Sequence, residues 1–112
     1  MKKLTLAFCL VGSFYSAAQA PQKMTYQSVV RSASNALISN SPVGTQISIL
    51  QGSSSGLAVY IERHTVTTNA NGLATMEIGN GTPVSGSFST IEWANGPYFL
   101  KTETDPAGGT VY

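Results

Sequence analysis

The stretch TTNANGLATMEIGNG, residues 67–81, decides how this chain folds, because asparagine-glycine turns enclose a short alternating run. Asn71-Gly72 is the pair that most readily supplies the positive φ angles of a type I′ hairpin turn. The run between the turns, residues 73–78, has the two-residue period of a strand, and its apolar face consists of Ala74, Met76 and Ile78. We therefore predict a hairpin that joins this strand to the one before it.

The same stretch also resembles a loop that holds an ion. Calcium sites need several oxygen ligands with carboxylates among them, but Glu77 is the only carboxylate here and lies in the middle of the strand. Asn69 and Asn71 offer neutral oxygens only. Residues 79–81, GNG, lack the lysine and the following helix of a phosphate-binding loop. We predict that the segment turns the chain and binds no metal.

Four further stretches are typical of strands: residues 24–31, 43–51, 57–68 and 98–104. In the first, Tyr26, Ser28 and Val30 share a face. The second is predicted to be half-buried, with Ile47 and Ile49 on the face opposite Gln46 and Ser48. The last alternates Tyr98, Leu100 and Thr102 with Phe99, Lys101 and Glu103.

The longest run, residues 57–68, changes the phase of its apolar residues. Val59 and Ile61 lie on one face, whereas Tyr60 and Val66 lie on the other. A bulge near Glu62–Arg63 would shift the register by one residue and reconcile the two halves.

Five short strands without helical periodicity predict an all-β fold, an antiparallel sandwich. Phe88, Ile91 and Trp93 are irregularly spaced, and we expect them to fill the interior under a crossing loop. Because such sandwiches usually have about seven strands, and residues 110–112 look like the start of another, we expect the last strand or strands to be missing.

The first 18 residues are typical of a secretory signal peptide. Lys2 and Lys3 precede an apolar stretch, residues 4–15, that is short for a bilayer span, and small residues follow it. We place the cleavage after Ala18, so that residues 19–112 form the sandwich domain. The single cysteine, Cys9, falls inside the signal. We therefore expect a secreted or cell-surface protein without a membrane span once the signal is removed.

Charge and histidine content argue against several classes of function. Charged residues make up 10% of the chain and the net charge is +1, so no basic surface supports nucleic-acid binding. His64 is the only histidine, which leaves a metal site or a catalytic triad without its other members. Glu62 shares a face with His64 if no bulge intervenes, and we interpret the pair as a polar contact within a strand.

Three aromatic residues, Trp93, Tyr98 and Phe99, have two interpretations. On the surface of a sandwich they would stack on a sugar or anchor a protein partner. Trp93 and Tyr98 also flank an ANGP turn, where they would pack against the end of the core. Both interpretations stay open at this point.

An ordered set of motifs then points to a family. APQKMTYQSVVR after the signal, SILQGSSSG, HTVTTNANGLATMEIGNG and FSTIEWANGPYFLKTETDPAGGT together resemble the N-terminal module of large secreted bacterial surface proteins. The resemblance implies a prealbumin-like or immunoglobulin-like sandwich followed by tail-fibre-like or repeat-bearing parts. It also implies a further strand and a PYALYA-like segment after the DPxGGT turn, which this sequence lacks. It implies no catalytic or cofactor-binding residues.

These observations lead to a functional hypothesis. We expect a non-catalytic structural or display module with no cofactor, whose partners are the C-terminal domains of a parent protein. The alternative is a carbohydrate-binding or adhesion module that uses Trp93, Tyr98 and Phe99 to contact a glycan or a surface protein.

Overall fold

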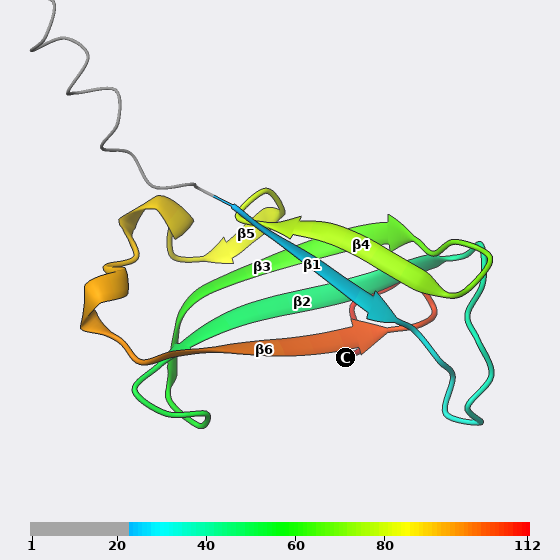
Figure 1. The fold of residues 1–112 in the computed structure, drawn as a ribbon, viewed down its shortest axis with the longest axis horizontal. Coiled ribbons are helices and arrows are strands. Elements are labelled where there is room, and N and C mark those ends of the chain that lie inside the picture. The colour runs from blue at the N-terminus through cyan, green and yellow to red at the C-terminus, as the bar shows by residue number, and fades with distance from the viewer. Residues whose placement is uncertain (1–22) are drawn as a thin grey trace, which may run out of the picture.

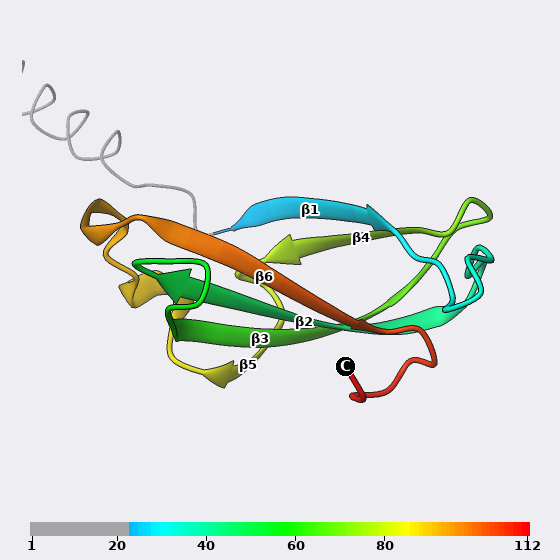
Figure 2. The same cartoon turned by 90° about the horizontal axis from the view of Figure 1, so that it is seen from below.

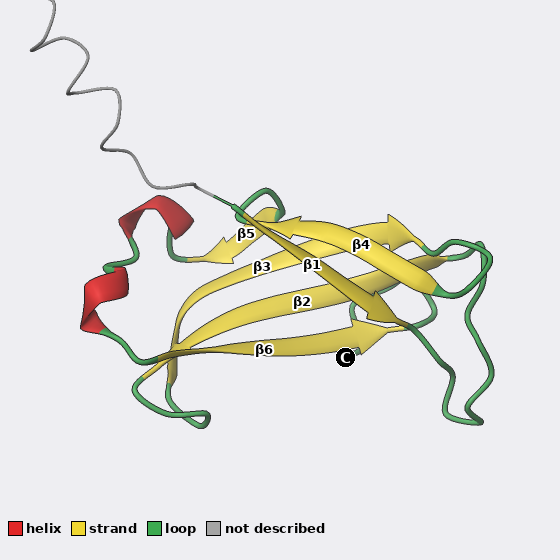
Figure 3. Cartoon of the chain, in the orientation of Figure 1, coloured by secondary structure: helices red, strands yellow, loops and turns green. Residues whose placement is uncertain are grey.

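The computed structural model describes residues 23–112 and shows a fold built almost entirely of strands (Figures 1 and 3). The predicted signal peptide, with Cys9 and the cleavage after Ala18, lies outside the described residues. None of the helices in the described part is long and apolar enough to cross a membrane.

Six strands and two short 3-10 helices follow one another along the chain. The strands are β1 Met24–Val29, β2 Pro42–Gln51, β3 Leu57–Thr67, β4 Leu73–Ile78, β5 Thr82–Ser85 and β6 Tyr98–Asp105. The helices η1 Phe88–Thr90 and η2 Trp93–Asn95 lie between β5 and β6.

The strands form two antiparallel sheets of unequal size. β1 and β4 pair with each other, and the larger sheet has the order β5-β3-β2-β6. Seen from the side, the two-stranded sheet lies over the four-stranded one (Figure 2). The predicted all-β sandwich is therefore confirmed.

The core lies between the two sheets. The predicted apolar face of β4 is buried in it, with Met76 the most exposed of its three residues at 4%. The rest of the buried core comes from both sheets and η1 and consists of Val30, Val43, Ile47, Ile49, Tyr60 and Phe88. Burial of these side chains from water is the main stabilising contribution to such a fold.

The prediction that β2 is half-buried was wrong, because both of its faces are covered. Ser48, on the face away from the core, is only 4% exposed. β2 is an interior strand, so side chains of β3 and β6 flank it on both sides. The last residues of the chain also fold over this outer face, where a Cβ on Gly44 would lie 2.0 Å from the carbonyl oxygen of Gly109.

The bulge in β3 lies at a different place from the predicted one. Ile49 pairs with Tyr60 and Leu50 with Ala58, so Val59 is the extra residue. From Ile61 onward the β2–β3 register is unbroken. Glu62 and His64 therefore share the inward face with Tyr60, because residues two apart in a regular strand point the same way.

The predicted hairpin at Asn71-Gly72 was also wrong. β3 pairs with β2 and β4 pairs with β1, so the turn carries the chain from one sheet to the other. Among the described residues the only non-glycines with positive φ are Asn35 and Asn40, which excludes a type I′ turn at Asn71. Instead the Asn69 side chain accepts hydrogen bonds from the N–H groups of Asn71 (2.9 Å) and Leu73 (3.0 Å).

Two other differences concern the second half of the chain. β5 was missed because Pro83 and the polar residues around it are typical of a loop, and such a strand occurs only at a sheet edge. Residues 110–112 form no strand. They are held by Asp105, whose carboxylate accepts hydrogen bonds from Ala107 (2.9 Å) and Val111 (3.1 Å). These bonds hold the pKa of the Asp105 carboxyl below its ordinary value.

Gly72 is one of the positions where this fold depends on a glycine. Its φ is +75°, and a Cβ there would lie 3.1 Å from both the Val30 carbonyl oxygen and a methyl group of Leu37. We expect Gly72→Ala to lower the free energy of unfolding by about 2–3 kcal/mol, through backbone strain and this close approach. Urea unfolding followed by tryptophan fluorescence measures the change.

The matched control is Gly52→Ala. Gly52 also has positive φ, +91°, but a Cβ there has nothing within 4 Å. This variant measures the cost of backbone strain alone, which we expect to lower the free energy of unfolding by about 1 kcal/mol. Equal losses in the two variants would contradict the role of close packing at the turn between the sheets.

Candidate functional site

The cluster of titratable side chains lies on the inward face of β3. Strand alternation directs Tyr60, Glu62 and His64 toward the smaller sheet. Glu62 is 0% exposed and its neighbour Tyr60 only 1%. The His64 side chain is 9% exposed. A charged group so deep in a protein needs hydrogen-bond partners, because burial removes its hydration.

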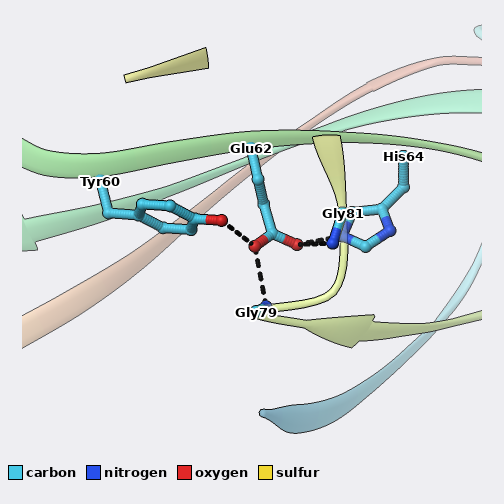
Figure 4. A network of polar contacts seen from close by, with 5 residues as sticks. All are labelled: Tyr60, Glu62, His64, Gly79 and Gly81. Atoms are coloured by element: carbon cyan, nitrogen blue, oxygen red, sulfur yellow. Dashed lines mark hydrogen bonds and ion pairs between the residues drawn. The ribbon is translucent and has the colours of Figure 1, made fainter. Parts of the chain in front are cut away.

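Glu62 has a full set of such partners (Figure 4). One carboxylate oxygen accepts hydrogen bonds from the Tyr60 hydroxyl (2.7 Å) and from the Gly79 N–H (2.8 Å). The other contacts Nε2 of His64 and accepts a hydrogen bond from the Gly81 N–H (3.2 Å). The predicted same-face contact between Glu62 and His64 is thus confirmed.

The two glycines belong to the loop that leads from β4 to β5. Glu62, in the larger sheet, therefore binds the loop that follows β4 of the smaller sheet. Gly81 approaches so closely that a Cβ would lie 2.6 Å from Nε2 of His64 and 2.7 Å from the Glu62 carboxylate. A side chain at this position would displace the loop. The arrangement therefore acts as a clamp, and we call Tyr60, Glu62, His64, Gly79 and Gly81 the carboxylate clamp.

The surroundings of Tyr60 keep its hydroxyl protonated. Burial, and then the hydrogen bond to Glu62, raise the pKa of the Tyr60 hydroxyl above its ordinary value, so Tyr60 remains a donor. Each carboxylate oxygen of Glu62 has two polar contacts. Among residues 23–112, no group of three or more His, Cys, Asp or Glu side chains is placed to hold a metal ion.

Two of the aromatic residues singled out in the sequence, Trp93 and Tyr98, belong to a row of rings that begins at Tyr60. Ring centroids lie 5.6 Å apart for Tyr60 and Phe88, 5.7 Å for Phe88 and Trp93, and 5.2 Å for Trp93 and Tyr98, all edge-to-face. This aromatic row leads from the clamp to an apolar cavity of about 240 Å³ whose lining includes Trp93, Tyr98 and Phe99.

The three predicted contact residues differ in their placement. Trp93 is 45% exposed, so its predicted role as a filler of the interior was wrong, because η2 carries it to the rim. Tyr98 packs against the core, and its hydroxyl donates to the Glu92 carbonyl oxygen at 2.6 Å. Phe99 pairs with Leu50, and strand alternation directs its side chain to the opposite face from Tyr98.

A second cavity, of about 290 Å³, was not anticipated from the sequence. It lies between the later residues of β1 and β6, and its lining includes Ser28, Arg31, Thr102 and Thr104. Polar residues in two distant strands give no local signal of proximity. The sequence gives one indication of it: the polar residue Thr102 shares a strand face with Tyr98 and Leu100, and a complete sandwich would bury that face.

The comparisons with known proteins place the chain in a family. Residues 25–112 match a family described as a domain of unknown function, DUF8740, and the chain belongs to that family. No curated protein and no solved structure matches the chain.

The clamp yields a stability prediction. Glu62→Ala should lower the free energy of unfolding by about 3–5 kcal/mol, because the donors it leaves behind stay buried and unpaired. Tyr60→Phe removes one bond and should cost about 1–2 kcal/mol. Guanidinium unfolding followed by circular dichroism measures both.

Glu103→Ala serves as the control, since Glu103 is a partly exposed carboxylate that contacts Lys101 at 3.9 Å. Its loss should cost at most about 1 kcal/mol. If Glu62→Ala were as mild as Glu103→Ala, the clamp would not hold the two sheets together.

Proposed function

We propose that this chain is a non-catalytic structural or display module of an exported bacterial surface protein. Its fold is a sandwich of the prealbumin-like or immunoglobulin-like type. Its partners are the C-terminal domains of a parent protein. The proposal involves no cofactor and no nucleic acid.

One observation carries the proposal: the carboxylate clamp uses its acid–base groups for structure. Glu62 is fully buried, and its two oxygens are bonded to Tyr60, His64 and two backbone N–H groups. A general acid or base has to reach the proton that it transfers. The clamp instead ties a loop to a strand, which is the role of a stabilising element.

Export is supported by the order of segments in the first 18 residues. Two lysines, an apolar stretch and small residues form the pattern that secretion machinery recognises, and the rest of the chain has no cysteine. A strand-rich sandwich without disulfides relies on burial and buried hydrogen bonds for stability outside the cell.

A fusion assay tests the export part of the proposal. Residues 1–22 fused to alkaline phosphatase lacking its own signal should give an active enzyme in bacteria, because this phosphatase gains activity only after export. Leu6→Arg places a charge in the apolar stretch and should abolish the activity, whereas Leu6→Val should retain it. Equal activity of the three fusions, or none from the unmodified leader, would remove the support for a surface location.

A carbohydrate-binding or adhesion module is the second candidate. It is favoured by the cavity of about 240 Å³ that Trp93 and Tyr98 border, with Trp93 about half exposed at its rim. Aromatic rings in such a position stack on the apolar faces of sugars.

A glycan array separates the two candidates. The structural role predicts no binding above background for the folded chain. The second candidate predicts binding to a defined glycan that falls at least about tenfold in Trp93→Ala, since loss of an aromatic contact typically costs more than 1 kcal/mol. Leu57→Ala is the matched control, because Leu57 is an exposed apolar residue that does not line this cavity.

A further inference from the structure

β1 has an open edge with unpaired backbone groups. In an antiparallel ladder, alternate residues direct their N–H and C=O groups toward the partner strand. The Val30 N–H donates to the Gly72 carbonyl oxygen at 2.8 Å, which continues the β1–β4 register. Thr25, Gln27 and Val29 therefore direct their backbone groups away from β4, and β4 is the only strand that pairs with β1 in the described part of the chain.

β6 has an inward face that the smaller sheet does not cover. Leu100, Thr102 and Thr104 share the face that Ile49 and Ile47 of β2 turn toward the core, yet all three are exposed, Leu100 to 45%. The larger sheet has four strands and the smaller has two, so the smaller sheet is too narrow to cover the whole inward face of the larger one. We call the space between residues 24–31 and residues 98–104 the seam.

The two ends of the seam differ in chemical character. The cavity of about 240 Å³ occupies one end, where Met24, Trp93 and Leu100 make its lining apolar. The cavity of about 290 Å³ occupies the other end and is lined by Ser28, Thr102 and Arg31. Arg31 is the only charged residue that lines either cavity. Its guanidinium donates to the backbone carbonyl oxygen of Asn35 at 3.2 Å, and no carboxylate among residues 23–112 pairs with it.

We propose that the seam binds an extended β-strand supplied by a different protein, with an acidic residue beside Arg31 and apolar side chains at the Trp93 end. The added strand pairs with Thr25, Gln27 and Val29 of β1. It covers the inward face of β6 and extends the smaller sheet to three strands. Backbone hydrogen bonds provide the affinity, and the two ends of the seam fix direction and register. Six paired residues span about 20 Å.

Charge complementarity identifies this occupant. A guanidinium with free donors binds a carboxylate more strongly than it binds a neutral group. The open edge of β1 requires a backbone that offers N–H and C=O groups at strand spacing, which a sugar or a small apolar molecule lacks. The described C-terminal residues do not fill the seam, because Tyr112 lies against Arg63 on the outer face of the larger sheet, 5.7 Å from ring centroid to guanidinium carbon.

A random decapeptide display library tests the proposal on the folded chain. The enriched peptides should alternate apolar and polar residues and carry Asp or Glu at one end. The most enriched peptide is then synthesised with a fluorophore and titrated by fluorescence anisotropy. Gln27→Pro removes an edge N–H and should weaken binding at least about tenfold, whereas Gln27→Ala keeps the N–H and should change it less than about twofold.

A second variant keeps the test decisive if Gln27→Pro misfolds. Arg31→Glu should weaken the acidic peptide at least about tenfold and, in a repeated selection, enrich Lys or Arg in its place. No enriched strand-like peptide, or binding unaffected by both variants, overturns the proposal. Dimerisation in light scattering that Gln27→Pro abolishes assigns the seam to a second copy and overturns it too.

This inference rests on the proposed structural role, because a display module has to assemble with other chains. A failure of the strand-binding inference can be told apart from a failure of the proposed function. The leader fusion does not involve the edge of β1, so a negative peptide selection leaves its result unchanged.

Discussion

The fold depends on a carboxylate that is fully buried and has to be neutralised by its surroundings. Glu62 is satisfied only if Tyr60, His64 and the loop containing Gly79 and Gly81 all occupy their positions. Because an unpaired buried charge is so costly, these contacts form together or not at all. The connection from β4 to β5 is thereby fixed against the larger sheet, and the two sheets are held at their spacing. A single side chain thus couples layers that share no backbone hydrogen-bond ladder.

The aromatic row connects this constraint to the surface. Tyr60 donates to Glu62, its ring contacts Phe88 edge-on, and Phe88 and Trp93 continue the row to Tyr98. The rings pack the end of the sandwich where the smaller sheet gives no cover. They also form one wall of the apolar end of the seam. The same residues therefore stabilise the interior and shape the surface where we propose that a partner strand binds.

The unequal size of the two sheets explains why an exposed sheet face and an open strand edge lie next to the core. A sandwich buries apolar side chains by facing two sheets of similar width, and here the smaller sheet leaves the inward face of β6 exposed. Its inward residues, Leu100 among them, stay exposed, and β1 keeps an open edge. Natural proteins usually protect such edges, because unpaired backbone groups attract other strands. In this chain the open edge and the uncovered face lie side by side, and an added strand would complete both.

The sequence by itself determined five of the six strands and the buried face of β4. The alternation of Ala74, Met76 and Ile78, and of Tyr98 and Leu100, depends only on the two-residue period of a strand, which is local. Tertiary structure decided which strands pair. Asn71-Gly72 can turn the chain within a sheet or between sheets. The second outcome depends on distant contacts, among them the pairing of β4 with β1 and the hydrogen bonds of Glu62 to the β4–β5 loop. Trp93 reached the rim, and Ser28, Arg31 and Thr102 met across the seam, for the same reason: contacts between residues far apart in sequence depend on the packing of both layers at once.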